Sequence, residues 1–125
     1  MPTKSVLICD DDQILVSIVK VVLAKKNFTI FTANDGAAAL KLIKSARPNL
    51  VFLDIDMPQK NGFEVLEDLK TGGFETIYKI VLSGREDKAS RDRALSLGAH
   101  EVWVKPFNAS RLLAAVDALI QQGKV

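Results

Sequence analysis

Short apolar runs alternate with longer amphipathic segments along this chain, and the alternation occurs five times. The short runs are rich in Val, Ile and Leu, and their length favours strands over buried helices. Several of them are almost continuously apolar, which is typical of parallel strands that are covered on both faces. The pattern therefore predicts five strands, at residues 5–9, 29–32, 50–53, 78–82 and 101–104.

The longer segments have the spacing of helices with one buried face. Residues that suit a helix N-cap precede three of these segments, namely Asp12, Asp35 and Asn108. The second helix must end by Arg47, because Pro48 disfavours helical geometry at the residue before it. Two more helices are predicted at 62–70 and 88–97, and Gly98 is well placed to end the latter.

Five strand–helix units in a chain of this length predict an α/β fold, a doubly wound parallel sheet with right-handed crossovers. Five strands fit the order 2-1-3-4-5, with five flanking helices, as in flavodoxin-like proteins. A chain of 125 residues and 13.7 kDa has room for one core. We therefore expect a single domain over 1–125, with its core at about 5–121.

Composition and charge narrow the possible classes of function. The 48% apolar and 26% charged residues are typical of a globular protein and argue against disorder. A net charge of +2 is too small to indicate a nucleic-acid surface, and no apolar stretch approaches the roughly 20 residues that span a bilayer. The N-terminus lacks the apolar stretch of a secretory signal, so we expect a cytoplasmic protein that binds neither membrane nor nucleic acid. The single cysteine, Cys9, lies in an apolar run and is expected to be a small buried residue.

Polar residues whose side chains can bind a ligand or react follow four of the five predicted strands. They are three acids after the first strand, two after the third, a hydroxyl after the fourth and an ammonium after the fifth: Asp10, Asp11, Asp12, Asp54, Asp56, Ser83 and Lys105. In an open α/β sheet, ligands bind beyond the carboxyl ends of the strands, where the strand order reverses. In the order 2-1-3-4-5 this point lies between the first and third strands, so the two acidic groups are expected to meet there.

Such a cluster of acids needs a cation or a proton. Carboxylates within about 5 Å of one another repel by roughly 3 kcal/mol per pair at an effective dielectric constant of 20. A set of oxygen ligands without His or Cys suits a hard cation, Mg²⁺ above all. Ser83 and Lys105 carry groups that bind phosphate. Metal, carboxylate, hydroxyl and lysine together indicate phosphoryl transfer to an aspartate.

Several of these residues also have a structural interpretation. Asp12 is more easily explained as a helix cap, and Lys105 taken alone as a solvated surface lysine. Ser83 fits a turn residue and a ligand equally well. Lys105 precedes Pro106, however, and a cis peptide bond there would hold the turn. His100 has no ligand partner in view and is expected at the surface.

Four motifs match a known family in their order and spacing. They are Asp10-Asp11 after the first strand, 53–58 with Gly62 following, Ser83-Gly84, and 104–107. On these motifs the chain resembles the receiver domain of bacterial two-component response regulators, as in chemotaxis regulators, over essentially its full length. The resemblance implies that Asp54 is the phosphoacceptor. It also implies that Asp10 and Asp11 hold Mg²⁺ through carboxylates, together with Asp54 and the backbone carbonyl of Asp56.

The resemblance further implies how such a domain works. Ser83 would follow the phosphoryl group and Lys105 would pair with it. The donor would be a histidine kinase or a phosphotransfer protein, and the output an effector protein or an appended domain. The domain would catalyse its own phosphorylation and slow hydrolysis without being an enzyme in the usual sense, and would repack the face of its fourth helix, fifth strand and fifth helix. One departure concerns the fifth strand, where Val102 stands in place of the family's frequent aromatic residue and Trp103 lies on the opposite face.

Two other functions compete with this interpretation. Asp54 and Asp56 look like the nucleophile and acid/base pair of haloacid-dehalogenase-type phosphatases, but Pro58, the order of the acids and the lack of room for a cap domain argue against that family. A degenerate receiver that acts only in binding is disfavoured, because all the expected site residues are present.

Two variable positions are predicted to set the lifetime of the phosphoryl group. Asp56 and Arg85 each lie two residues beyond a site residue on neighbouring strands, so their side chains are expected to face each other at the mouth of the site. The cognate kinase, the pathway and the output stay open, as does the question whether the chain is a stand-alone regulator or part of a longer one.

Overall fold

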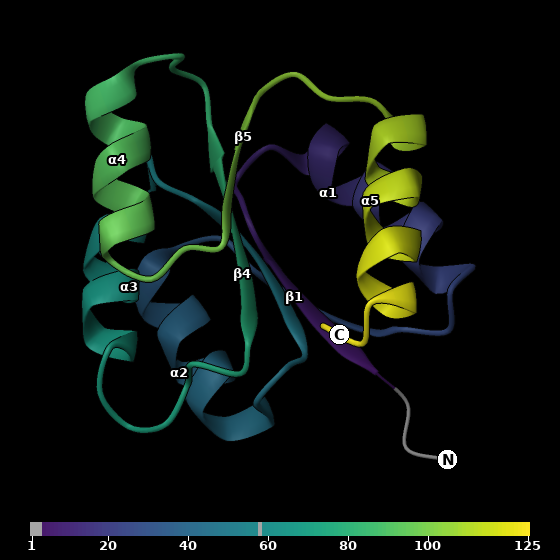
Figure 1. Ribbon diagram of the computed structural model, residues 1–125, viewed down its shortest axis with the longest axis horizontal. Coiled ribbons are helices and arrows are strands. Elements are labelled where there is room, and N and C mark those ends of the chain that lie inside the picture. The colour runs from purple at the N-terminus through teal and green to yellow at the C-terminus, as the bar shows by residue number, and fades with distance from the viewer. Residues whose placement is uncertain (1–3, 58) are drawn as a thin grey trace.

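A five-stranded parallel sheet separates two layers of helices in the computed structural model, which describes residues 4–57 and 59–125 (Figure 1). Pro58, part of one predicted motif, and residues 1–3 lie outside the described residues. The strands run in the order β2-β1-β3-β4-β5, which confirms the predicted fold class and topology. Their bounds are β1 Ser5–Cys9, β2 Thr29–Ala33, β3 Leu50–Asp54, β4 Tyr78–Ser83 and β5 Glu101–Val104.

Three strands continue one residue beyond their predicted ends. The extra residues are Ala33 in β2, Asp54 in β3 and Ser83 in β4. The apolar pattern ended each strand at its last large apolar residue, whereas the backbone ladder continues and pairs Asp54 with Leu82 and Ser83 with Val104. Two of the predicted site residues are therefore held by the sheet itself and not by a loop.

The five helices follow the strands as predicted: α1 Gln13–Ala24, α2 Gly36–Ala46, α3 Gly62–Leu69, α4 Lys88–Ser96 and α5 Ala109–Gln121. Each begins behind an Asp or Asn whose side chain accepts backbone N–H bonds from the first turn, and these caps are Asp12, Asp35, Asn61, Asp87 and Asn108. The structural interpretation of Asp12 as a cap is thus correct. Arg47 ends α2 in the left-handed region, with φ 46°, directly before Pro48.

The sheet divides the buried side chains into two cores. Helices α1 and α5 cover one face and α2, α3 and α4 the other (Figure 1). Successive residues of a strand point to opposite faces, so Trp103 packs beside Phe52 in the α1–α5 core while Val102 packs against the other core. The expectation that these two β5 side chains point in opposite directions is confirmed. No helix of the described ranges is long and apolar enough to cross a bilayer.

His100 lies at the surface, as expected, but it has a specific partner. Its Nδ1 accepts the backbone N–H of Lys79 at 3.1 Å, and its ring stacks on Tyr78 with ring centres 4.5 Å apart. Burial lowers the pKa of His100, as do the charges of Lys79 and Lys124, against an opposing effect of Glu101. Protonation of Nδ1 would remove the acceptor of this hydrogen bond.

We therefore expect acid to destabilise the protein through His100. The folded state holds the imidazole neutral more firmly than the unfolded chain does, so stability is present above the unfolded pKa, near 6.5, and is lost as the pH falls below it. Melting temperatures of the parent and of His100→Gln between pH 7.5 and 5 measure this effect. The parent should lose more than the variant over that interval, and parallel curves would contradict the prediction.

Candidate functional site

The carboxyl ends of β1 and β3 bring three carboxylates together. Oxygen atoms of Asp10, Asp11 and Asp54 all lie within 4.8 Å of one another. Asp10 and Asp54 are buried, with exposed fractions of 1% and 4%, whereas Asp11 is exposed. Parallel strands β1 and β3 are direct neighbours, so Asp10, directly after β1, and Asp54, the last residue of β3, meet at one sheet edge.

The chain bends sharply after each buried acid and bonds back to it. Oδ1 of Asp10 accepts the backbone N–H of Asp12 at 2.8 Å, and Oδ1 of Asp54 accepts that of Asp56 at 3.0 Å. One oxygen of each carboxylate is thereby fixed, and Oδ2 of each is directed at the centre of the cluster, toward Lys105.

Lys105 supplies the counter-charge for the two buried acids. Its Nζ lies 2.8 Å from Oδ2 of Asp10 and 3.2 Å from Oδ2 of Asp54, and its side chain is only 23% exposed. The backbone N–H of Lys105 donates to the carbonyl of Ser83 at 2.7 Å, and its peptide bond to Pro106 is cis, as expected. Burial alone would lower the pKa of Lys105, but the contact with Asp10 and the charges of Asp54 and Asp10 outweigh it and raise the pKa. The interpretation of Lys105 as a solvated surface lysine is wrong.

Burial and crowding also change the other titratable groups of the site. Burial raises the pKa of Asp54, reinforced by the charge of Asp10 and opposed by the bond from Asp56 and by Lys105. Burial, with the nearby charges of Asp35 and Asp10, raises the pKa of Cys9 to about 12. Cys9 is fully buried and stays a thiol, in keeping with its predicted role as a small apolar residue.

The donor set fits a hard divalent cation. All the clustered ligand atoms are carboxylate oxygens, and neither His nor Cys is among them. Oδ2 of Asp10 is buried and, despite its ion pair with Lys105, accepts no hydrogen bond of suitable geometry from a described residue. A buried charged oxygen left in this way is a ready metal ligand.

Ser83 reaches the same end of the sheet, but its hydroxyl bonds within its own turn. Oγ accepts the backbone N–H of Arg85 and donates to the carbonyl of Arg85, both at 3.0 Å. The side chain is buried and adjoins the β4–α4 turn. In this arrangement Ser83 is a turn former, one residue beyond Leu82, which pairs with Asp54 on the neighbouring strand.

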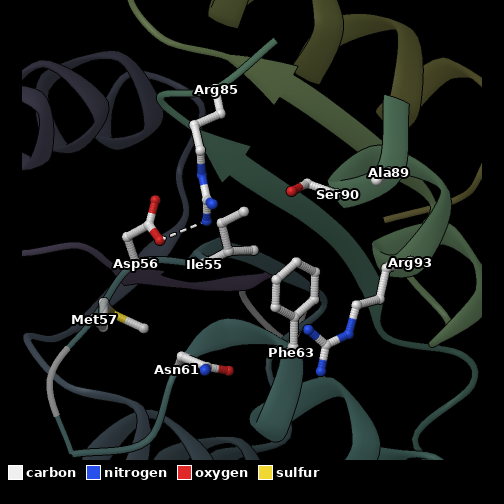
Figure 2. A pocket seen from close by; sticks show the side chains of 9 residues that line it. All are labelled: Ile55, Asp56, Met57, Asn61, Phe63, Arg85, Ala89, Ser90 and Arg93. Atoms are coloured by element: carbon white, nitrogen blue, oxygen red, sulfur yellow. Dashed lines mark hydrogen bonds and ion pairs between the residues drawn. The ribbon is translucent and has the colours of Figure 1, made fainter. Parts of the chain in front are cut away.

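Asp56 and Arg85 form an ion pair at the rim of the site (Figure 2). The guanidinium Nη2 lies 2.8 Å from Oδ1 of Asp56, and both side chains are more than half exposed. The predicted contact between them is confirmed, and at this exposure it contributes only about 0.2–1 kcal/mol to stability. The Asp56 carboxylate is not among the clustered oxygens, and its backbone carbonyl as a metal ligand stays a prediction.

Residues 6–117 match the family model described as the response regulator receiver domain. The chain belongs to this family. Among curated relatives, response regulator MprA of Mycobacterium ulcerans is 33% identical over 120 residues, which cover 96% of this chain and 51% of MprA. The receiver domain thus spans about half the length of the curated relatives it matches.

Solved structures agree with this assignment. A CheY-like receiver domain protein from Methanospirillum hungatei superposes with a TM-score of 0.87 at 26% identity and covers 97% of this chain and 96% of its own. The Mn²⁺-bound form of response regulator Rcp1 gives a TM-score of 0.79 at 25% identity, covering 93% of this chain and 91% of its own. Family membership favours the receiver interpretation over the haloacid-dehalogenase alternative.

Proposed function

We propose that this receiver domain accepts a phosphoryl group on Asp54 from a histidine kinase or a phosphotransfer protein. The observation that carries the proposal is the convergence of Lys105, Asp10 and Asp11 on the buried carboxylate of Asp54. Asp10, Asp11 and Asp54, with the backbone carbonyl of Asp56, would hold Mg²⁺, as the Mn²⁺-bound form of the similar regulator Rcp1 supports. When bound, Mg²⁺ would offset the negative charge that carboxylates and phosphoryl oxygens bring together.

The transfer makes one bond and breaks one bond. A carboxylate oxygen of Asp54 bonds to phosphorus while the bond from phosphorus to the donor's imidazole nitrogen breaks, and its electron pair leaves with the imidazole. The bond from the Asp56 backbone holds Oδ1 of Asp54, which leaves Oδ2 as the attacking oxygen. Lys105, already 3.2 Å from Oδ2, would move its ammonium onto a phosphoryl oxygen and balance the charge there.

Ser83 and β5 would transmit the conformational change on phosphorylation to the surface. The Ser83 hydroxyl would leave the Arg85 backbone and donate to a phosphoryl oxygen, which would draw the β4–α4 turn inward. Because the Lys105 N–H is bonded to the Ser83 carbonyl, β5 is tied to the same movement. We infer that the α4–β5–α5 face carries the output, and that Val102, smaller than an aromatic side chain, changes how that face repacks.

We infer that the phosphoryl donor docks on an apolar patch beside the site. Ile14 on α1 is 76% exposed and borders a small hollow together with Ile18, Pro106 and Phe107. This apolar patch lies next to Lys105, where a donor protein would approach Asp54. We likewise propose that the output passes to an effector protein or an appended domain; this chain spans about half the length of its curated relatives.

The direct test of the proposed function is phosphorylation by a small donor. The protein is incubated with phosphoramidate and Mg²⁺, and its intact mass is followed with time. One added phosphoryl group is expected. When Mg²⁺ is chelated before the donor is added, the mass should stay unchanged. A mass that never changes would refute the proposal.

Mg²⁺ is expected to stabilise the protein. The apo cluster holds three carboxylates against one ammonium, so a divalent cation that binds only the folded state raises the melting temperature by mass action. Asp11→Asn should weaken this response and stabilise the metal-free protein slightly, because one repelling charge is removed. Melting curves with EDTA and with millimolar Mg²⁺ measure both effects. A parent protein insensitive to Mg²⁺ would count against the metal site.

Arg85 is expected to prolong the life of the aspartyl phosphate. The ion pair of Arg85 with Asp56 partly covers the mouth of the site and would hinder the water that attacks in line. Arg85→Ala should therefore speed dephosphorylation several-fold, since about 1.4 kcal/mol in a barrier is tenfold in rate, with little change in melting temperature. Dephosphorylation rates of the parent, Arg85→Ala, Asp56→Asn and the double variant measure this effect. If the two effects were strictly additive on the log rate, the residues would not act as a pair.

A further inference from the structure

A hollow of about 520 Å³ lies beside the Asp56–Arg85 pair, between the β3–α3 loop and helix α4 (Figure 2). None of the three clustered carboxylates lines it, but Asp56 and Arg85 do, so the hollow adjoins the rim of the proposed phosphorylation site. Its volume is within the range of roughly 300–1,000 Å³ that small-molecule sites occupy. Ile55, Met57 and Phe63 lie at its base, but they are almost fully buried, with exposed fractions of 2%, 8% and 6%.

Hydrogen-bond donors dominate the polar lining of this hollow. Arg93 makes no ion pair within the described ranges 4–57 and 59–125, and its guanidinium rests 4.2 Å from the centre of the Phe63 ring. This cation–π contact places the guanidinium against the Phe63 ring, and its N–H groups are open to a ligand. Figure 2 shows the Ser90 side chain on the same side of the hollow as Arg93.

Asn61 adds a donor because its acceptor is already used. Its Oδ1 accepts the backbone N–H of Glu64 at 3.0 Å as the cap of α3, which leaves the amide NH₂ group for another partner. Across the hollow, Arg85 provides a second guanidinium, and its partner Asp56 is the only carboxylate of the described lining. Two guanidiniums against one carboxylate give the lining a net positive charge.

We propose that this hollow binds a small organic phosphate. Guanidinium groups match phosphate oxygens in geometry and charge, and the amide of Asn61 donates in addition. The small apolar surface that Ile55, Met57 and Phe63 leave exposed would contact the organic part of the ligand. Arg85 belongs both to the hollow and to the pair with Asp56, so a bound phosphate competes with Asp56 for this guanidinium.

Binding can be tested without phosphorylation of the protein. AMP and inorganic phosphate serve as probes in EDTA at constant ionic strength, where the acidic cluster lacks metal and repels anions. Nitrogen–proton NMR signals of the Arg93 and Arg85 side chains and of the Asn61 amide are followed during titration. Saturable shifts at these groups are expected, with tighter binding of AMP than of inorganic phosphate. Shifts that grow linearly with either probe, or tighter binding of inorganic phosphate, would overturn the proposal.

Two substitutions on α4 separate a built site from diffuse attraction. Arg93→Gln should weaken AMP binding about tenfold, because a charge-assisted bond to phosphate is lost. Arg91→Gln removes the same charge from the same helix outside this hollow and should leave the affinity unchanged. Melting temperatures of both variants check that they fold. If the two substitutions weakened AMP binding equally, the binding would come from the general positive charge of α4, and the proposed site would be rejected.

Discussion

Asp54→Asn is expected to abolish phosphorylation by phosphoramidate, and this is the largest single effect that the site predicts. A carboxamide oxygen is neither charged nor a competent nucleophile toward phosphorus, so no acyl phosphate can form. Intact mass after incubation with phosphoramidate and Mg²⁺ should stay unchanged in the variant, while the parent gains one phosphoryl group. The expected difference is complete loss, not a reduced rate.

The matched control for this variant is Asp56→Asn. Asp56 lies two residues further along the same loop, and its exposed carboxylate pairs with Arg85 outside the carboxylate cluster. The Asp56→Asn variant should still be phosphorylated on Asp54. Asp54→Asn should also fold, because Lys105 keeps its ion pair with Asp10 and a buried charge with a raised pKa has been removed. Equal labelling of Asp54→Asn and the parent would mean that another residue is the acceptor.

Local apolar patterning was sufficient to predict the fold. Continuous runs such as 50–53 indicate strands that are buried on both faces, and the helices between them leave few ways to connect parallel strands. The strand ends were less predictable, because Asp54 and Ser83 keep pairing with their neighbours after the apolar run has stopped. Backbone hydrogen bonds in the sheet do not depend on the apolar character of the side chain, and no hydropathy pattern can register them.

The location of the site could be predicted from the strand order, but the contacts of its side chains could not. Once the strand order is known, the acids at the carboxyl ends of β1 and β3 must meet at one edge. The sequence left open whether Lys105 reaches those acids, since this depends on the turn at Pro106 and on how deeply the side chain is buried. The donors around Arg93 gave no sequence signal, because they come from two loops and a helix that only the tertiary fold brings together.

Lys105→Ala is expected to give the second-largest effect, and it separates charge balance from metal binding. The ammonium lies between two buried carboxylate oxygens, 2.8 Å from Asp10 and 3.2 Å from Asp54. Its removal should lower the free energy of unfolding of the metal-free protein by about 1–3 kcal/mol, because buried charges lose their partner. Mg²⁺ should then restore stability by more than it does in the parent, since the cation no longer competes with the ammonium for the same oxygens.

Phosphorylation of Lys105→Ala should nevertheless be slow. Without the ammonium, one phosphoryl oxygen loses a charge-assisted bond in the transition state, and a loss of about 1.5–3 kcal/mol corresponds to a rate reduced roughly 10- to 100-fold. Melting curves with and without Mg²⁺, together with the rate of mass gain from phosphoramidate, measure both halves of the prediction. Lys88→Ala is the matched control, because that lysine is exposed and, among the residues that the structure describes, pairs only with Asp92 one turn along α4. If Lys105→Ala matched this control in both stability and rate, the short contacts of Lys105 would be a resting arrangement of the side chain without a part in phosphoryl transfer.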